Sequence, residues 1–333
     1  MIEISKNEKN CLKGLKYIDL FAGIGGFRIA FDSFGANCVF TSEWDKHAQE
    51  VYNNNFGDLP NGDITLVDEK TIPKHDILCG GFPCQAFSIS GKQRGFEDTR
   101  GTLFFDIVRI AEYHKPKLLL LENVANFEKH DNGNTLKTIL NALKELNYNV
   151  FYKVLNASNL GIPHKRERIF FVCFRKDLGI ESFEFKTNIN KPVKLIDILL
   201  PDDETKEFII NRDDIKFHNV KVEIDIFGNY PQRPIRVGTV SKGGQGERIY
   251  HECGHAITLS AYGGGVGAKT GLYLINGKVR KLAPRECARL LGLPDTFVIA
   301  KNKNQAYKQF GNGVVVDVLQ HILKEINMRL CNG

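Results

Sequence analysis

The chain has 333 residues, of which 42% are hydrophobic and 25% are charged, as in an ordinary globular protein. A chain of this length can bury a large core and is expected to form two domains. Its net charge of +6 permits a polyanionic partner without requiring one, because many basic proteins only carry a solvated basic surface. The polar first residues and the lack of a long apolar run argue against a signal peptide and a membrane span, so we expect a cytoplasmic protein.

Eight cysteines are scattered along the chain without a CxxC pair, which favours reduced thiols over a disulfide framework. His251 and His255 have HxxxH spacing, but their stretch is rich in glycine and offers no obvious third ligand. We therefore predict that the protein binds no metal.

The first half of the chain alternates short apolar runs with helical patterns. Strands are expected at 17–21, 38–41, 76–78, 118–121 and 168–174. Asp45 is the expected N-cap of the helix after the second strand. Apolar residues at helical spacing between Leu136 and Leu146 predict a helix with one buried face. The alternation predicts an α/β fold with a doubly wound, mostly parallel sheet and helices on both faces.

The composition and periodicity of the sequence change after about residue 180. Charged, less periodic sequence is followed by residues 238–271, which hold ten of the 31 glycines. This composition predicts a smaller, glycine-rich second domain of loops and short strands. From Gln309 onward, an apolar run leads into a helical pattern that is able to return to the first domain.

Two reactive side chains follow predicted strands of the first domain. Cys84 lies in a glycine-flanked loop that begins at Cys79, and Glu122 follows the leucines at 118–121 directly. The carboxyl ends of parallel strands share one edge of the sheet, where ligands bind. A thiol and an acid at this edge predict covalent catalysis. A buried free cysteine is more often inert, and Cys79, on the strand itself, is the better candidate for that role.

The glycine-rich turn at 23–26 follows the first strand and opens a helix, as in sites where a ligand approaches the backbone. The dinucleotide fingerprint fails because Arg28 stands where its third glycine should be, which disfavours a dehydrogenase. Glu43 and Trp44 after the second strand suit a ribose and an adenine face, and Asp63 suits an adenine edge. A helix cap and a buried tryptophan are the alternatives. Together the clusters favour S-adenosylmethionine.

The chain resembles the DNA (cytosine-5)-methyltransferases over nearly its whole length. The matching strings, in order, are FAGIGGFR, EWD, GDI, GFPCQAFSISGKQRGFEDTRG, ENV, GIPHKRERIFF, RKLAPRECARLLGLPD and QFGNGVVVDVL. The resemblance implies a catalytic, cofactor-binding domain at 1–196 and 307–333. It also implies a target-recognition domain with a hinge at 197–306. One departure is Gly313, where a similar member of the family has serine.

The resemblance also implies roles for individual residues. Carbon 5 of cytosine is a poor nucleophile, and addition of the Cys84 thiolate to carbon 6 would activate it, with Glu122 supplying a proton at N3. The implied catalytic residues are Cys84, Glu122, Asn123, Arg166 and Arg168, with both arginines expected to point to one side of a strand. The implied cofactor-binding residues are Phe21, Gly23, Ile24, Gly26, Glu43, Trp44, Asp63, Ile64, Pro83, Leu103 and Asn312. The implied DNA-binding residues are Ser90, Arg100, Gln245, Arg248, Thr258, Ser260 and Tyr262.

The implied substrate is double-stranded DNA, with the target base flipped out of the stack. The glycine-rich segment resembles that of family members that modify the first cytosine of GCGC, and Ser90 and Gln245 would enter the duplex beside the flipped base. We expect a monomer that protects DNA in a restriction-modification system and shares its site with an endonuclease. A tRNA cytosine-5 methyltransferase and a catalytically silent DNA-binding regulator are the alternatives. The first would lack the long DNA-reading segment, and the second would lack the intact catalytic residues.

Overall fold

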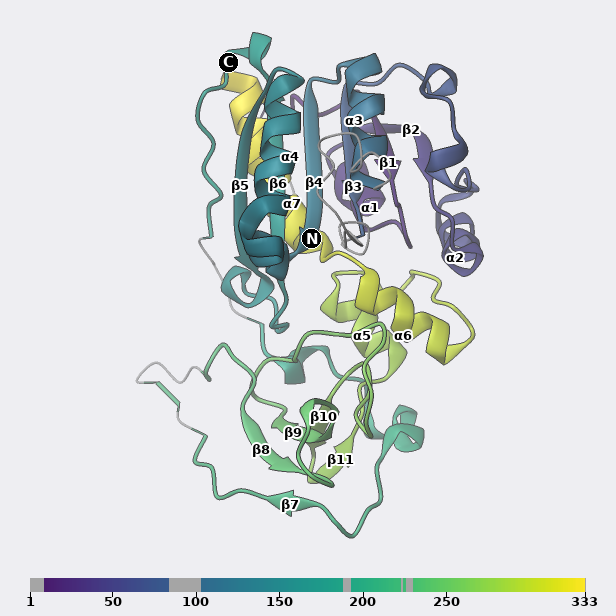
Figure 1. Cartoon of the computed structure of the whole chain (residues 1–333). Helices are drawn as coiled ribbons and strands as arrows, with labels where there is room; N and C mark the ends of the chain where they lie inside the picture. The colour runs from purple at the N-terminus through teal and green to yellow at the C-terminus, as the bar shows by residue number, and fades with distance from the viewer. Residues whose placement is uncertain (1–8, 84–102, 188–192, 223, 226–229, 333) are drawn as a thin grey trace. The chain divides into compact units, whose positions relative to one another are not determined.

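The computed structural model describes residues 9–83, 103–187, 193–222, 224–225 and 230–332 (Figure 1). The chain divides into two compact units. Unit 1 comprises Met1–Leu155, Arg168–Lys186 and Leu319–Gly333, and unit 2 comprises Asn156–Glu167 and Thr187–Val318. Among the described residues, no helix is both long and apolar enough to cross a membrane. The predicted site residues Cys84, Ser90 and Arg100 lie outside the described residues.

Unit 1 is built around a six-stranded sheet of order β2-β1-β3-β4-β6-β5. Strands β2, β1, β3 and β4 run parallel to one another, and β6 pairs antiparallel with β4, so the sheet is mixed. The strands are β1 (Lys16–Leu20), β2 (Asn37–Ser42), β3 (Ile77–Gly81), β4 (Leu118–Val124), β5 (Tyr148–Asn156) and β6 (Glu167–Arg175). The helices are α1 (Gly26–Ser33), α2 (Lys46–Phe56), α3 (Leu103–His114), α4 (Asn134–Glu145) and α7 (Val316–Asn332).

Helices cover both faces of this sheet, as predicted for a doubly wound α/β fold. Figure 1 shows α3 and α4 over one face, and their buried residues Phe104 and Ile139 join an apolar cluster with Leu121 of β4. On the other face, the ring of Tyr17 in β1 stacks on Phe31 of α1, with 4.8 Å between the ring centroids. The core of unit 1 therefore lies on both sides of the sheet and fixes the strand ends in place.

Two local predictions in unit 1 are confirmed. Helix α4 covers the stretch where apolar residues recur at helical spacing, and it buries Leu136, Ile139 and Leu143. The side chain of Asp45 caps α2 by accepting hydrogen bonds from the backbone N–H groups of His47 and Ala48 at 2.9 and 3.2 Å. Both follow from short-range patterns, since a helical face and an N-cap are set by residues within a turn or two.

Unit 2 contains a five-stranded sheet of short strands, in the order β11-β10-β9-β8-β7. Strands β9 and β10 pair in parallel, and the other neighbours pair antiparallel. Side chains of this sheet, including Val237, Ile249 and Leu272, form a small apolar cluster. The elements are β7 (Lys216–Phe217), β8 (Arg236–Thr239), β9 (Arg248–His251), β10 (Leu272–Ile275), β11 (Lys278–Arg280), α5 (Pro284–Leu290) and α6 (Lys303–Asn312).

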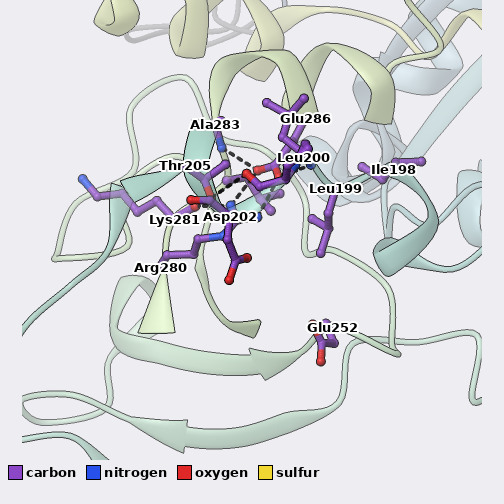
Figure 2. Close-up of polar contacts among 12 residues, drawn as sticks. Ile198, Leu199, Leu200, Asp202, Thr205, Glu252, Arg280, Lys281, Ala283 and Glu286 are labelled. Atoms are coloured by element: carbon purple, nitrogen blue, oxygen red, sulfur yellow. Dashed lines mark hydrogen bonds and ion pairs between the residues drawn. The ribbon is translucent and has the colours of Figure 1, made fainter. Parts of the chain in front are cut away.

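A buried ion pair connects three segments of unit 2 (Figure 2). The carboxylate of Glu286, which is fully buried, accepts hydrogen bonds from both terminal nitrogens of Arg280 at 2.7 and 2.8 Å. It also accepts from the backbone N–H groups of Ala283 and Leu200 at 2.7 and 2.9 Å. Burying two charges is costly unless their hydrogen bonds are satisfied, and these four donors satisfy the carboxylate. The pair therefore ties β11 and α5 to the segment at Leu200.

The cysteines differ from expectation in one respect. Cys11 and Cys331 are joined in a disulfide across 320 residues of sequence, so the prediction of reduced thiols throughout is wrong for this pair. The side chain of Asn327 reinforces the junction, because it accepts from the backbone N–H of Cys11 at 2.7 Å and donates to the carbonyl of Lys9 at 2.9 Å. Residues so far apart in sequence become neighbours only through the fold, which spacing rules cannot anticipate.

Candidate active site

The carboxyl ends of β3 and β4 bring an acid beside the segment that leads to Cys84. Gly81, the last residue of β3, is the register partner of Glu122 in β4. A Cβ atom on Gly81 would lie 3.1 Å from Oε2 of Glu122, so glycine leaves the space that the carboxylate occupies. Glu122 is 8% exposed, which places a nearly buried acid at this edge of the sheet.

An arginine from the antiparallel strand β6 reaches this acid. The Nε atom of Arg168 lies 2.9 Å from Oε1 of Glu122, and the two side chains are 14% and 11% exposed. Arg168 is the register partner of Val124, two residues beyond Glu122, so the same face of the paired strands carries both groups. A charge-assisted hydrogen bond in such a shielded place is strong and fixes the carboxylate in one orientation.

Asn123 connects the end of β4 to the segment that follows β3. Its Nδ2 donates to the carbonyl of Phe82 at 2.9 Å, and its Oδ1 accepts from the backbone N–H of Val124 at 2.8 Å. Asn123 is only 2% exposed, so both ends of the amide are satisfied where water is scarce. Phe82 is two residues before Cys84, and the hydrogen bond therefore fixes the chain just before it enters the loop that carries the predicted nucleophile.

Arg166 has different partners from Arg168. Strand β6 begins at Glu167, so the strand alternation that we used to place both arginines on one side does not extend to Arg166. Arg166 belongs to unit 2 and is 2% exposed. Its guanidinium donates to the carbonyls of Leu259, Gly311 and Gly313. The structure thus brings Glu122, Asn123 and Arg168 together in unit 1, and it places Arg166 among backbone carbonyls of unit 2.

The glycine-rich turn after β1 has the backbone that its sequence predicts. Gly23 and Gly25 have φ angles of +55° and +92°, and Phe21 also has a positive φ, of 58°. A Cβ atom on Gly25 would lie 2.3 Å from the ring of Phe56, so only glycine fits there without displacing that ring. No described atom lies within 4 Å of the position that a Cβ of Gly23 would take, which leaves the turn open at this point. Ile24 is buried beneath the turn, and Gly26 begins α1.

Glu43 and Trp44 lie immediately after β2, next to this turn. The carboxylate of Glu43 accepts from the backbone N–H of Gly23 and of Asp45, both at 2.8 Å. Burial raises the pKa of Glu43 above its usual 4.5, and these backbone donors act in the opposite direction. The side chain of Trp44 is 77% exposed, so the alternative of a buried tryptophan is wrong. A carboxylate and an open indole therefore border the turn.

The side chain of Asp63 caps a short local turn. Asp63 does not end a strand, because it caps a short 3₁₀ turn, Ile64–Leu66, and the next strand begins only at Ile77. Its Oδ1 accepts from the backbone N–H and the hydroxyl of Thr65 at 3.0 and 2.9 Å. Ile64 is buried, while Pro83 is exposed and Leu103 begins α3.

Arg28 forms contacts that a glycine could not supply. It lies on α1 and bonds to Asp32 and Asp58 at 2.6 and 2.9 Å, and its guanidinium lies 5.2 Å from the ring centroid of Phe56 in α2. The residue that breaks the dinucleotide fingerprint therefore packs α1 against α2 and the residues that follow it. Asp19 is a buried residue that sequence patterns do not single out. It is a fully buried carboxyl on β1, and desolvation raises its pKa well above 3.8.

The residues predicted to bind DNA lie on loops and strand starts of unit 2. Gln245 is exposed in a 3₁₀ turn that leads into β9, and Arg248 is the first residue of that strand. A Cβ on Gly246 would lie 1.9 Å from the carbonyl oxygen of Gly264, so the turn packs directly against a second glycine loop. Close backbone approach of this kind explains part of the glycine content of residues 238–271.

We call residues 256–262 the target segment, because they hold three predicted DNA contacts. The hydroxyl of Thr258 donates to the carbonyl of Lys165 at 2.5 Å, and the backbone N–H of Ser260 donates to the carbonyl of Lys269 at 2.9 Å. Tyr262 is 75% exposed. The tyrosine is thus presented to solvent, whereas the hydroxyl of Thr258 already has an acceptor.

Asn312 and Gly313 end α6 within unit 2. A Cβ atom on Gly313 would lie 2.9 Å from Cδ1 of Leu291 and 3.2 Å from the carbonyl oxygen of Gln309. A larger residue would therefore need Leu291 to shift. The tight contact gives a physical reason for glycine here.

The fold is that of known methyltransferases. A solved structure of Dnmt2 methyltransferase from S. pombe superposes with a TM-score of 0.70 at 18% identity, covering 96% of this chain and all of that one. The methyltransferase EhMeth of Entamoeba histolytica gives a TM-score of 0.70 at 17% identity, covering 94% of this chain and 98% of that one. These likenesses define an α/β methyltransferase architecture.

Sequence comparison is more specific. Residues 15–328 match the family described as C-5 cytosine-specific DNA methylases, and the chain belongs to this family as a DNA (cytosine-5)-methyltransferase. It is 57% identical to the type II methyltransferase M.HhaI of Haemophilus parahaemolyticus, over 99% of this chain and 98% of the relative. It is 44% identical to the type II methyltransferase M.HpaII of Haemophilus parainfluenzae, over 98% of this chain and 93% of that relative. The sequence-based assignment to the family is confirmed.

Proposed function

We propose that the protein methylates carbon 5 of a flipped-out cytosine in double-stranded DNA through a covalent bond to Cys84. The observation that carries the proposal is the set of contacts at the ends of β3 and β4. There Arg168 pairs with Glu122, and Asn123 forms a hydrogen bond with the carbonyl of Phe82, two residues before Cys84. An oriented acid beside the entry to a loop with a thiol suits an addition that needs both a nucleophile and a proton.

In this mechanism the Cys84 thiolate forms a bond to carbon 6 of cytosine, and the electron pair of the 5,6 double bond moves to carbon 5. Glu122 supplies a proton at N3, which stabilises the charge that develops on the ring. Arg168 holds the carboxyl group of Glu122 in place. After methylation, water accepts the proton on carbon 5 and the thiolate leaves from carbon 6. The proton on N3 then returns to the Glu122 carboxylate, which restores the neutral aromatic base. Asn123 keeps Phe82, and hence the start of the loop, at a fixed distance from the acid.

S-adenosylmethionine is the proposed cofactor, and when bound it supplies an electrophilic methyl group. The residues after β1 and β2 fit an adenosine, because the Glu43 carboxylate is held by two backbone donors and keeps further lone pairs for ribose hydroxyls. The open indole of Trp44 can cover an adenine face. We propose that Phe21, Gly23, Ile24, Gly26, Asp63, Ile64, Pro83, Leu103 and Asn312 complete the site.

The proposed target is the first cytosine of GCGC on each strand. This proposal rests on the likeness of the glycine-rich segment to members of the family that modify GCGC. Arg248 suits it physically, because a guanidinium reads the two major-groove acceptors of guanine. Gln245 and Tyr262 are exposed, as groups that enter or touch a duplex must be. Ser90, Arg100, Thr258 and Ser260 are proposed to contact DNA beside them.

The biological setting is proposed from the type II methyltransferases that the chain resembles. We infer that the protein acts in the cytoplasm as a monomer, modifies the two strands in separate events and protects DNA from a cognate endonuclease. We also propose that residues 1–196 and 307–333 hold the catalytic machinery, whereas residues 197–306 recognise the target and act as a hinge.

A trapping experiment tests the covalent mechanism. In DNA that contains 5-fluorocytosine, the substituent on carbon 5 cannot leave after methylation, so the adduct should persist and give a protein–DNA band on a denaturing gel. We expect the band with the wild type and none with Cys84→Ala, while Cys79→Ala serves as the control for a buried thiol on β3. An equal band from Cys84→Ala would overturn the proposal. A parallel panel of DNA and RNA duplexes, followed by bisulfite sequencing, identifies the substrate and the modified base.

A further inference from the structure

Three segments of unit 2 meet at Arg166. They are the segment at 163–166, the target segment at 256–262, and the end of α6 at 309–313. Arg166 lies at the centre, because its Nη1 donates to the carbonyl of Leu259 at 3.3 Å and its Nη2 donates to the carbonyl of Gly311 at 2.9 Å. A further hydrogen bond reaches the carbonyl of Gly313. One nearly buried guanidinium therefore holds carbonyl groups from two segments that are far apart in sequence.

The target segment also touches the end of α6 directly. A Cβ atom on Gly311 would lie 2.2 Å from the backbone nitrogen of Ala261 and 2.5 Å from the carbonyl carbon of Ser260. These are backbone atoms, which cannot move aside as the end of a flexible side chain can. Only glycine therefore allows the two backbone segments to approach this closely. The carbonyl of Gly311 is at the same time an acceptor for Arg166. The approach of the backbones and the arginine contact thus form one junction.

Further hydrogen bonds connect the target segment to the residues before Arg166. Ala256 donates its N–H to the carbonyl of Pro163 and accepts from the N–H of Lys165, both at 2.8 Å. The N–H of Leu259 lies 3.3 Å from Nε2 of His164, which is fully buried. The target segment is therefore attached along most of its length to the stretch that ends in Arg166.

We propose that Arg166 is a positioning residue of the target segment, which it holds against Gly311–Gly313 so that Ser260 and Tyr262 meet DNA in a fixed register. This inference rests on the proposed function, because it assumes that the target segment faces DNA. It differs from a catalytic role in that Arg166 acts through the backbone carbonyls that it holds. Its hydrogen bonds to Leu259, Gly311 and Gly313 go to backbone carbonyls, as a group that organises the backbone requires.

The two roles of Arg166 predict different kinetic signatures. If Arg166 sets the register of the target segment, its loss misplaces groups that discriminate between bases. The rate of chemistry on DNA that is fully bound then changes little. If Arg166 contacted the reacting base, its loss would lower the single-turnover rate even at saturating DNA, while discrimination between sequences would remain.

The test compares Arg166→Gln and Arg166→Lys with the wild type, on a duplex with the preferred site and on duplexes in which one flanking base of that site is changed. We expect Arg166→Gln to lower the preference for the correct site at least about tenfold, the size of one misplaced base contact. The single-turnover rate at saturating preferred DNA should stay within about threefold, a small change on a free-energy scale. Arg166→Lys keeps the charge and can satisfy fewer carbonyls, so it should recover part of the preference.

Gly311→Ala tests the same junction from the other side. Its methyl group would push Ser260 and Ala261 away without altering any charge, and it should reproduce the loss of preference. Because both changes disturb one junction, the double variant should lose much less than the sum of the two effects. Arg285→Gln is the matched control, since Arg285 of unit 2 also donates to backbone carbonyls, those of Pro294 and Phe297. It should keep the preference of the wild type.

Two results would overturn the proposal. One is a fall of about a hundredfold in the single-turnover rate of Arg166→Gln with unchanged sequence preference, which is the size of a lost catalytic group. The other is an unchanged preference in Arg166→Gln, Arg166→Lys and Gly311→Ala. If Arg166→Gln does not fold, Arg166→Lys and Gly311→Ala decide the question. Failure of the proposed function would show separately, as a wild type that does not methylate DNA.

Discussion

The Nε atom of Arg168 lies 2.9 Å from Oε1 of Glu122, and this pair joins β6 to the carboxyl end of β4 next to the last residue of β3. Both side chains are largely shielded from water. A carboxyl group held in this way has one orientation, as transfer of a proton to a bound base requires. The arginine supplies that orientation from a strand that runs antiparallel to β4.

We expect Glu122→Gln to lower the rate of methyl transfer by at least about a hundredfold, the usual effect of removing a general acid. Glutamine keeps the size of the side chain and a hydrogen-bond acceptor for Arg168, but it cannot deliver a proton from a carboxylic acid. Single-turnover assays with a labelled methyl group measure this change. Glu69→Gln is the control, because Glu69 also pairs with an arginine in unit 1, Arg109 at 2.8 Å, away from the strand ends. A full rate in Glu122→Gln would contradict the assigned role.

Cofactor affinity should depend on the charge of Glu43. Burial raises the pKa of this carboxyl above 4.5, and we expect its ionised form to hold the ribose hydroxyls. Affinity for S-adenosylmethionine should therefore fall as the pH drops through that raised pKa. Trp44 is the only tryptophan of the chain, so quenching of its fluorescence measures binding directly.

Glu43→Gln should remove this pH dependence and weaken binding at neutral pH. Loss of a charged acceptor costs roughly 1.5–3 kcal/mol, which is at least about tenfold in the dissociation constant. Glu69→Gln again serves as the control and should bind as the wild type does. Equal affinity of Glu43→Gln and the wild type across this pH range would reject the assignment of Glu43 to the ribose.

Much of the fold and part of the site could be predicted because their signals are local. Three such signals are the apolar spacing of α4, the cap at Asp45 and the apolar strand before Glu122. Each is contained in a stretch of about a dozen residues or fewer. The partners of Arg166 could not be predicted in the same way, because they lie 93 to 147 residues away and are backbone carbonyls, which every residue carries. A cap is one of the alternatives for the carboxylates near the turn, and the structure shows Asp63 in that role.

Two buried histidines should make the protein less stable in mild acid. Desolvation lowers the pKa of both His75 and His255 to about 4, from an ordinary value of 6.5. Between these values the unfolded chain binds protons that the folded protein does not, so the free energy of unfolding should fall as the pH drops from about 6.5 to about 4. Each proton contributes a slope of up to about 1.4 kcal/mol per pH unit.

Denaturant unfolding at several pH values measures this slope, and His75→Gln and His255→Gln should each make it shallower. Ser158→Ala is the control for His255, because it removes the hydroxyl that lies 2.9 Å from Nδ1 of the imidazole but no titratable group. It should lower stability equally at every pH. Identical slopes in the wild type and both histidine variants would show that these side chains do not remain neutral in the folded state.

The disulfide between Cys11 and Cys331 should stabilise the oxidised protein, because it joins segments 320 residues apart. A cross-link over so long a loop restricts the unfolded chain strongly, and breaking it should lower the free energy of unfolding by about 2–4 kcal/mol.

Titration of thiols in denaturant should find two fewer than the eight cysteines of the sequence before reduction, and all eight afterwards. Cys11→Ser should unfold at the temperature of the reduced wild type, whether or not a reductant is present. Cys253→Ser, at a free cysteine of unit 2, is the control and should keep the difference between oxidised and reduced protein. Eight reactive thiols in the untreated protein, or equal melting temperatures before and after reduction, would contradict this prediction.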